Sequence, residues 1–139
     1  MSLFEEVSRF IEQCEDPKCE DFDVYESREY VKIYTSSLNR HRNHFVIYVT
    51  EQVDGSFKLS DDGETLSDLK QSGISFESPE KMKLLRMFIG SPTVKTDGID
   101  LETEATSDDF ISKMLSLLRA MEDAEDLRYS NPFDNMDEI

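Results

Sequence analysis

The feature that most constrains the fold is an apolar run followed closely by a turn signal. Residues 45–51 read Phe-Val-Ile-Tyr-Val-Thr-Glu, Asp54-Gly55 follows, and residues 57–60 read Phe-Lys-Leu-Ser. Asp-Gly between two strand-like segments is a strong hairpin signal, because both residues tolerate the left-handed backbone of a tight turn. We therefore predict an antiparallel hairpin over residues 45–60. The near-continuous apolar run also predicts that its first strand is buried on both faces.

Two further segments have the pattern of strands. Residues 30–35 read Tyr-Val-Lys-Ile-Tyr-Thr, so that Val31 and Ile33 share one face of a strand while Lys32 shares the other with two tyrosines. Residues 36–44 are polar and predict a loop that carries two arginines and two histidines. Residues 93–104 predict a second hairpin, which turns at Asp97-Gly98.

Four helices are predicted from capping residues and from apolar side chains at helical spacing. They cover residues 2–14, a short segment that starts within residues 60–66 and runs to about residue 72, residues 78–90 and residues 107–127. The predicted N-caps of the first, third and fourth helices are Ser2, Ser78 and Ser107. The second and third helices are predicted to end at Gly73 and Gly90. The fold class is therefore α+β: a small antiparallel sheet of hairpins packed with several helices, including a long C-terminal helix.

The length of 139 residues predicts one domain, which we place at residues 1–128. Residues 129–139 are acidic and contain Pro132, so we expect a frayed C-terminal tail there. No apolar run reaches the length of a membrane span, which predicts a protein without a membrane association. The oligomeric state is left open by the sequence.

The charge balance restricts the partners. The chain carries 31 acidic residues against 15 lysines and arginines, a net charge of −16. Such a surface repels phosphates, which excludes direct binding of nucleic acid, and attracts basic proteins such as those that hold DNA or RNA. The alternative is that the acidity only keeps the protein soluble. Residues 97–139 hold 13 acids and 3 bases, whereas residues 28–44 hold four bases and one acid.

The two cysteines, Cys14 and Cys19, do not have a zinc-ligand spacing, and no second cysteine pair accompanies them. We expect reduced thiols, a cytoplasmic location in a bacterial host cell, and no cofactor. The two loop histidines, His41 and His44, are too few for a metal site and are expected at the surface. No pattern of a catalytic triad or of a phosphate-binding loop is found, so we expect that the chain is not an enzyme.

The acidic cluster Asp61, Asp62 and Glu64 follows a predicted strand and precedes a predicted helix. Three carboxylates at such a point could hold Mg²⁺, as in a metal-dependent phosphodiesterase. The simpler interpretation is a turn in which an acid satisfies the free amides at the helix start. We favour the structural turn and keep the metal site as a weak alternative.

A second acidic cluster lies at the end of the chain, after the apolar stripe of the last helix. A row of carboxylates on a helix can occupy a groove that normally holds nucleic-acid phosphates. The predicted partner-binding residues are Glu122, Asp123, Glu125, Asp126, Asp134, Asp137 and Glu138.

The segment Phe57-Lys58-Leu59-Ser60-Asp61-Asp62-Gly63-Glu64-Thr65-Leu66-Ser67-Asp68-Leu69 resembles the hallmark of the family catalogued as domain of unknown function 1828. The resemblance extends over about residues 28–127 and implies a bacterial or phage setting, but no activity. In size and charge the chain is similar to phage anti-CRISPR proteins. The resulting hypothesis is a non-enzymatic inhibitor that mimics DNA charge and blocks a nucleic-acid-binding protein, in particular Cas9 with its guide RNA. An adaptor, immunity or regulatory protein of a bacterial operon is the alternative.

Overall fold

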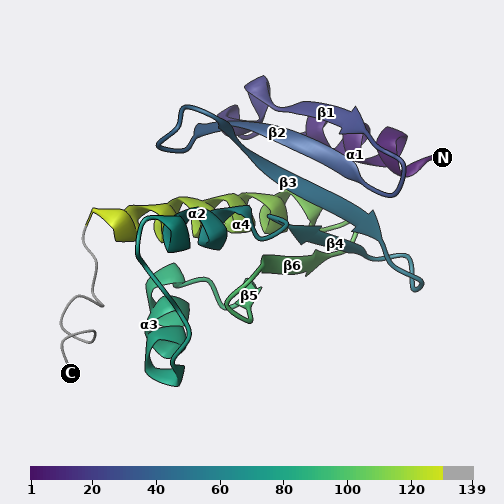
Figure 1. The fold of residues 1–139 in the computed structure, drawn as a ribbon. Coiled ribbons are helices and arrows are strands. Elements are labelled where there is room, and N and C mark those ends of the chain that lie inside the picture. The colour runs from purple at the N-terminus through teal and green to yellow at the C-terminus, as the bar shows by residue number, and fades with distance from the viewer. Residues whose placement is uncertain (130–139) are drawn as a thin grey trace.

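A computed structural model describes residues 1–129 of the chain (Figure 1). Its centre is a six-stranded antiparallel sheet with the strand order β1-β2-β3-β4-β6-β5. The strands are β1 (Asp23–Glu26), β2 (Val31–Leu38), β3 (His44–Glu51), β4 (Phe57–Ser60), β5 (Lys95–Thr96) and β6 (Leu101–Ala105). The first four strands thus lie side by side in chain order, and β6 joins the sheet beside β4.

The predicted hairpin over residues 45–60 is confirmed by the pairing of β3 with β4, in which Glu51 lies opposite Phe57. Gly55 takes the left-handed conformation at its turn, with φ +87°. Burial along β3 alternates: Phe45, Ile47 and Val49 are buried, while the side chains between them are only partly covered. The expectation of burial on both faces is therefore wrong, because the helices cover one face of the sheet.

Strand β2 is longer than predicted. Val31, Ile33 and Thr35 face the core and Lys32 lies on the other face, as the alternation of residues indicated. The strand continues past the predicted boundary to Leu38, with a shift of register between Tyr34 and Leu38. The loop in the structure is correspondingly shorter than the predicted loop of residues 36–44, because backbone pairing extends both strands of this hairpin beyond their apolar parts.

The α-helices of the described part are α1 (Leu3–Glu12), α2 (Glu64–Gln71), α3 (Pro79–Ile89) and α4 (Phe110–Glu125), and two short 3₁₀ helices are η1 (Pro17–Asp21) and η2 (Asp126–Arg128). Ser2 and Ser78 cap α1 and α3 as predicted, each accepting a backbone N–H bond three residues on. The predicted cap Ser107 is wrong. Helix α4 begins after Asp109, whose carboxylate turns back to the Thr106 amide at 2.6 Å.

The core forms where α1 and α4 cover one face of the sheet. Helix α1 contacts β1 and β2, whereas α4 contacts β3, β4 and β6 (Figure 1). Three aromatic rings join these layers: Phe10 of α1, Phe57 of β4 and Phe110 of α4, with ring centroids 4.7–5.7 Å apart. The predicted α+β class, with a sheet of hairpins and a long C-terminal helix, is confirmed.

Cys14 and Cys19 form a disulfide that links the end of α1 to η1. The expectation of reduced thiols is therefore wrong for this structure. The spacing excluded a zinc site but left room for a bridge, because η1 folds the chain back and brings the two Cα atoms to 6.3 Å. No helix within residues 1–129 is long and apolar enough to cross a membrane.

Candidate functional site: an acidic hollow at the end of α4

Four of the predicted acidic residues lie around one surface hollow of about 420 Å³. Its walls come from η1, the β2–β3 hairpin, the C-terminal half of α4 and the first residue of η2. The lining residues are Lys18, Ser37, Leu38, Phe45, Arg119, Glu122, Asp123, Glu125 and Asp126. The four carboxylates outnumber the two cations, Lys18 and Arg119, although the carboxylate of Glu125 is buried and paired with Arg128, so the hollow carries a net negative charge. We call it the acidic hollow.

The carboxylates of the acidic hollow differ in the hydrogen bonds and ion pairs that they form. Glu122 accepts a hydrogen bond from the Ser37 hydroxyl at 2.8 Å and lies 3.9 Å from the Lys18 ammonium. Asp123 pairs with Arg119 at 3.1 Å, one turn earlier on α4. Asp126 is exposed, and its carboxylate forms no ion pair with any residue of the described range 1–129. The exposed pairs are weak, so an incoming cation can compete for these carboxylates.

Glu125 does not belong to the exposed acidic surface. Its side chain is buried, accepts the Arg40 backbone N–H at 3.2 Å and pairs with the Arg128 guanidinium at 3.0 Å. The prediction that Glu125 binds a partner directly is therefore not supported by its placement. It instead fixes the β2–β3 loop and the end of α4 against each other, which shapes the wall of the acidic hollow.

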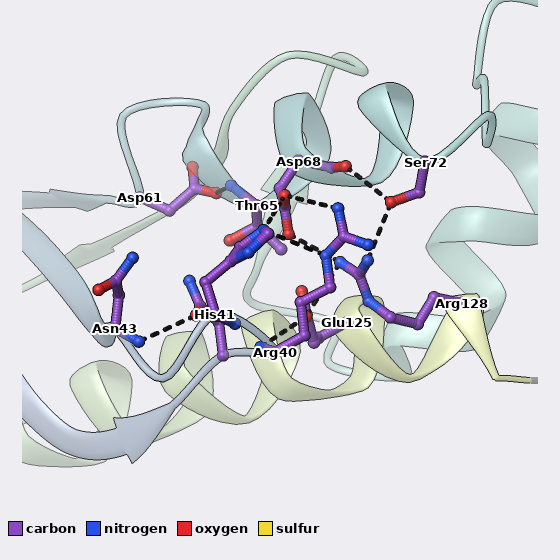
Figure 2. Close-up of polar contacts among 10 residues, drawn as sticks. Arg40, His41, Asn43, Asp61, Thr65, Asp68, Ser72, Glu125 and Arg128 are labelled. Atoms are coloured by element: carbon purple, nitrogen blue, oxygen red, sulfur yellow. Dashed lines mark hydrogen bonds and ion pairs between the residues drawn. The ribbon is translucent and has the colours of Figure 1, made fainter.

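An internal ionic network continues from Glu125 to Asp68 of α2. Asp68 lies 2.7 Å from Arg128, 3.3 Å from Arg40 and 2.9 Å from the His41 ring, so that α2, the β2–β3 loop and η2 meet on one carboxylate (Figure 2). Burial acts to raise the pKa of Asp68, but the hydrogen bonds from His41 and Arg40 and the two arginine charges outweigh it and lower the pKa below its ordinary value. Asp68 therefore stays ionised and holds the network closed.

The sequence prediction missed this network, apart from noting Arg40 and His41 on a polar loop. Asp68 lies in the family-like motif, but its partners are 27 to 60 residues away. The only local signal is the pair Glu125 and Arg128, an acid and a base three residues apart at the end of a helix, which are neighbours on its surface.

The acidic turn has a different geometry from a metal site. Asp61 is fully buried, and its carboxylate accepts backbone N–H bonds from Gly63 at 2.9 Å, Thr65 at 3.1 Å and Leu101 at 2.9 Å. It thereby joins the end of β4, the start of α2 and the start of β6. Burial raises the pKa of Asp61, although these hydrogen bonds act in the opposite direction.

The other two acids of the turn are exposed. Asp62 has the left-handed φ of 56°, and Glu64 accepts a hydrogen bond from the Tyr48 hydroxyl at 2.8 Å. Burial and the Glu64 contact raise the pKa of Tyr48 above its ordinary value. Within residues 1–129, no three histidine, cysteine or acidic side chains are arranged so that they could hold a metal ion. The geometry thus favours the structural interpretation of this turn.

The remaining predicted partner-binding residues, Asp134, Asp137 and Glu138, lie outside the described residues, as does most of the predicted tail. His41 lies on the β2–β3 loop as expected, and His44 begins β3.

Comparison with known proteins gives one result. A family model described as Domain of unknown function DUF1828 matches residues 35–123, which run from within β2 to within α4 and include the Asp61 turn and Asp68. No curated protein and no solved structure matches the chain.

Proposed function

The chain belongs to the family of the domain of unknown function DUF1828, and we propose that it is a non-enzymatic binding protein that holds a basic partner through the acidic hollow. The observation that carries the proposal is the gathering of Glu122, Asp123 and Asp126 around one hollow, of which Asp126 is exposed and without a cation partner in the described part of the chain. A lysine or arginine of a partner can enter such a hollow and pair with these carboxylates.

The net charge of the whole chain also supports a basic partner. A net charge of −16 accelerates encounter with a basic surface and repels polyanions. The partner class is a nucleic-acid-binding protein, whose basic groove offers lysines and arginines at the spacing of phosphates. Within that class the specific partner is a CRISPR–Cas9 effector with its guide RNA, and the carboxylates take the place of DNA phosphates.

This assignment implies a cytoplasmic site of action in a bacterial host. The Cys14–Cys19 disulfide is the described feature that weighs against it, because cytosolic thiols are kept reduced. Alkylation of protein from freshly lysed host cells, read by mass spectrometry, decides the redox state. Full alkylation of both cysteines agrees with the cytoplasmic proposal, and complete protection contradicts it.

The binding proposal is tested with the double variant Asp123→Lys and Asp126→Lys, measured against purified Cas9 with guide RNA by biolayer interferometry. We expect at least about a tenfold rise in Kd, equivalent to about 1.4 kcal/mol. The matched control is Glu51→Lys with Asp108→Lys, which makes the same charge change at two exposed positions away from the hollow. Glu125 is left unchanged, because its reversal would disrupt the internal network.

Three outcomes separate the levels of the proposal. Equal loss of affinity in the two double variants would show that only net charge matters and would overturn the role of the hollow. Binding to Cas9 no tighter than to polylysine would overturn the Cas9 assignment while leaving a general basic partner. Inhibition that is equally strong when DNA is added before the protein would contradict mimicry of DNA charge.

A further inference from the structure

A second surface has the opposite character from the acidic hollow. Helix α3 stands across α4 at the side away from β1 and β2 (Figure 1). Its residues Lys83 and Arg86 are exposed, and Lys95 of β5 is exposed beside it. Arg86 and Lys95 line a hollow of about 430 Å³ whose other lining residues, Ser91, Pro92, Val94 and Thr96, are uncharged. We call these three cations, with the hollow, the basic corner.

Apolar side chains are exposed at the same place. Met87 is 67% exposed and Phe88 is 37% exposed, and the partly buried Leu84 precedes them by three and four residues, so the three share one face of α3. Other apolar side chains of α3, Leu85 and Ile89, are buried in the core. The helix therefore packs on one side and presents an apolar stripe on another.

The basic corner brings together three cations that lack carboxylate partners. Arg9, Arg28, Lys32 and Arg42 also form no ion pair within residues 1–129, but they do not line a shared hollow. Lys95 also borders a neighbouring hollow with Asp97, Asp100 and Glu102. Acids outnumber bases by two to one, and Lys18, Lys58, Lys70, Lys113 and Arg119 all form ion pairs. Within residues 1–129, Lys83, Arg86 and Lys95 form none. Arg86 instead donates to the Thr96 carbonyl at 3.3 Å, which holds its guanidinium over the β5 end of the hollow.

We propose that the basic corner docks a short acidic, amphipathic segment of a second partner protein. Apolar side chains of that segment cover Met87 and Phe88, and its carboxylates pair with Lys83, Arg86 and Lys95. An amphipathic segment docks by laying its apolar face on an apolar surface of the receptor, and Met87 and Phe88, with the partly buried Leu84, supply such a surface on α3. The protein then joins two partners, a basic one at the acidic hollow and an acidic one at the basic corner.

A short segment fits this corner better than an anionic membrane. A bilayer is a wide negative plane, which would meet the repulsion of a chain with net charge −16 beyond the edge of the corner. A peptide of a few turns engages only the three cations and the two apolar anchors, and avoids most of that repulsion because exposed charges beyond about 8 Å are screened at physiological salt.

The test uses the full chain and a fluorescein-labelled peptide of about 12 residues, roughly three helical turns, in which Phe and Leu recur every three to four residues and Asp and Glu fill the positions between them. Fluorescence anisotropy is expected to show saturable binding. The double variant Lys83→Glu and Lys95→Glu should weaken it at least about tenfold, and Met87→Ser at least about threefold. Arg9→Glu with Arg28→Glu is the matched control, since both arginines are exposed and unpaired within residues 1–129, and it should leave the affinity within about twofold.

Circular dichroism of each variant shows whether the fold is kept. If the control variant loses as much affinity as the Lys83→Glu, Lys95→Glu variant, only net charge matters and the proposal is overturned. Binding of phosphatidylserine vesicles in place of the peptide, abolished by the same variants, would assign the corner to membranes and overturn it. A dimer in light scattering that Met87→Ser dissociates would show a second copy on the face, and tighter peptide binding after removal of residues 130–139 would show the chain's own end there. Either result would also overturn it.

Discussion

Replacing Asp61 by Asn is the sharpest test of how the acidic turn stabilises the fold. The carboxylate accepts three backbone N–H bonds, from Gly63, Thr65 and Leu101. An amide keeps one acceptor oxygen, which can serve the two donors now on Oδ1, but it turns an NH₂ group toward the third. A buried donor left without an acceptor costs about 1–3 kcal/mol, so Asp61→Asn should lose about 1–3 kcal/mol in the free energy of unfolding.

Asp61→Ala removes all acceptors and should cost more, about 3–5 kcal/mol. The matched control is Asp62→Asn, the same chemical change at the next residue, where the side chain is exposed and Asn tolerates the left-handed backbone. It should stay within about 0.5 kcal/mol of the native chain. Urea unfolding followed by circular dichroism gives all three values. Equal losses for the two Asn variants, or a loss below about 1 kcal/mol for Asp61→Ala, would refute the argument.

Three further outcomes are expected. The folded pKa of Asp68 lies below its unfolded value, so its contribution to stability is present above the unfolded pKa and is lost as pH falls through the folded pKa. The difference in unfolding free energy between the native chain and Asp68→Asn should therefore shrink from pH 6 to pH 2 in urea titrations. A difference that stays constant over this range would contradict the role of Asp68. Asp109→Ala removes the acceptor of the Thr106 amide and the partner of Lys113, so it should lower the unfolding free energy by about 1 kcal/mol, whereas Ser107→Ala should lower it by less than about 0.5 kcal/mol. Thermal melts measure both values, and a larger loss for Ser107→Ala would show that the serine caps the helix. Glu125→Lys should destabilise the fold by about 3 kcal/mol or more, because it leaves Arg128 buried beside a like charge. Asp126→Lys should change stability by less than about 0.5 kcal/mol. Similar losses of unfolding free energy for the two variants, measured with denaturant, would show that Glu125 is not internal.

The parts of the fold that local chemistry determines could be predicted from the sequence. Asp54-Gly55 marked the β3–β4 turn, and Ser2 and Ser78 marked two helix starts, because caps and tight turns depend on residues a few positions apart. Strand β1 was missed. Its four residues, Asp23–Glu26, are too short and polar to show a pattern, and they become a strand because β2 offers a free edge.

The candidate site divides in the same way. The acidic character of residues 122–126 could be read from composition, and the structure places these residues around one hollow. The direction of Glu125 could not be read, because it depends on Arg40, which is 85 residues away along the chain. The sequence likewise shows three acids at the turn but not which one is buried, since that depends on the arrival of the Leu101 amide from β6.

Because β1 to β4 follow one another in both the chain and the sheet, this meander needs only short loops to close and can form while the rest of the chain is still being made. One edge of strand β4 then stays unpaired until β6, about 40 residues later in the chain, has been made and pairs with it. During that interval Phe57 and Leu59 lie next to unpaired backbone groups, which is the arrangement that recruits strands from other chains. The yield of soluble protein should therefore depend on how fast α2, α3 and β6 follow, and slow synthesis across residues 61–105 is the step at which this chain is most exposed to aggregation.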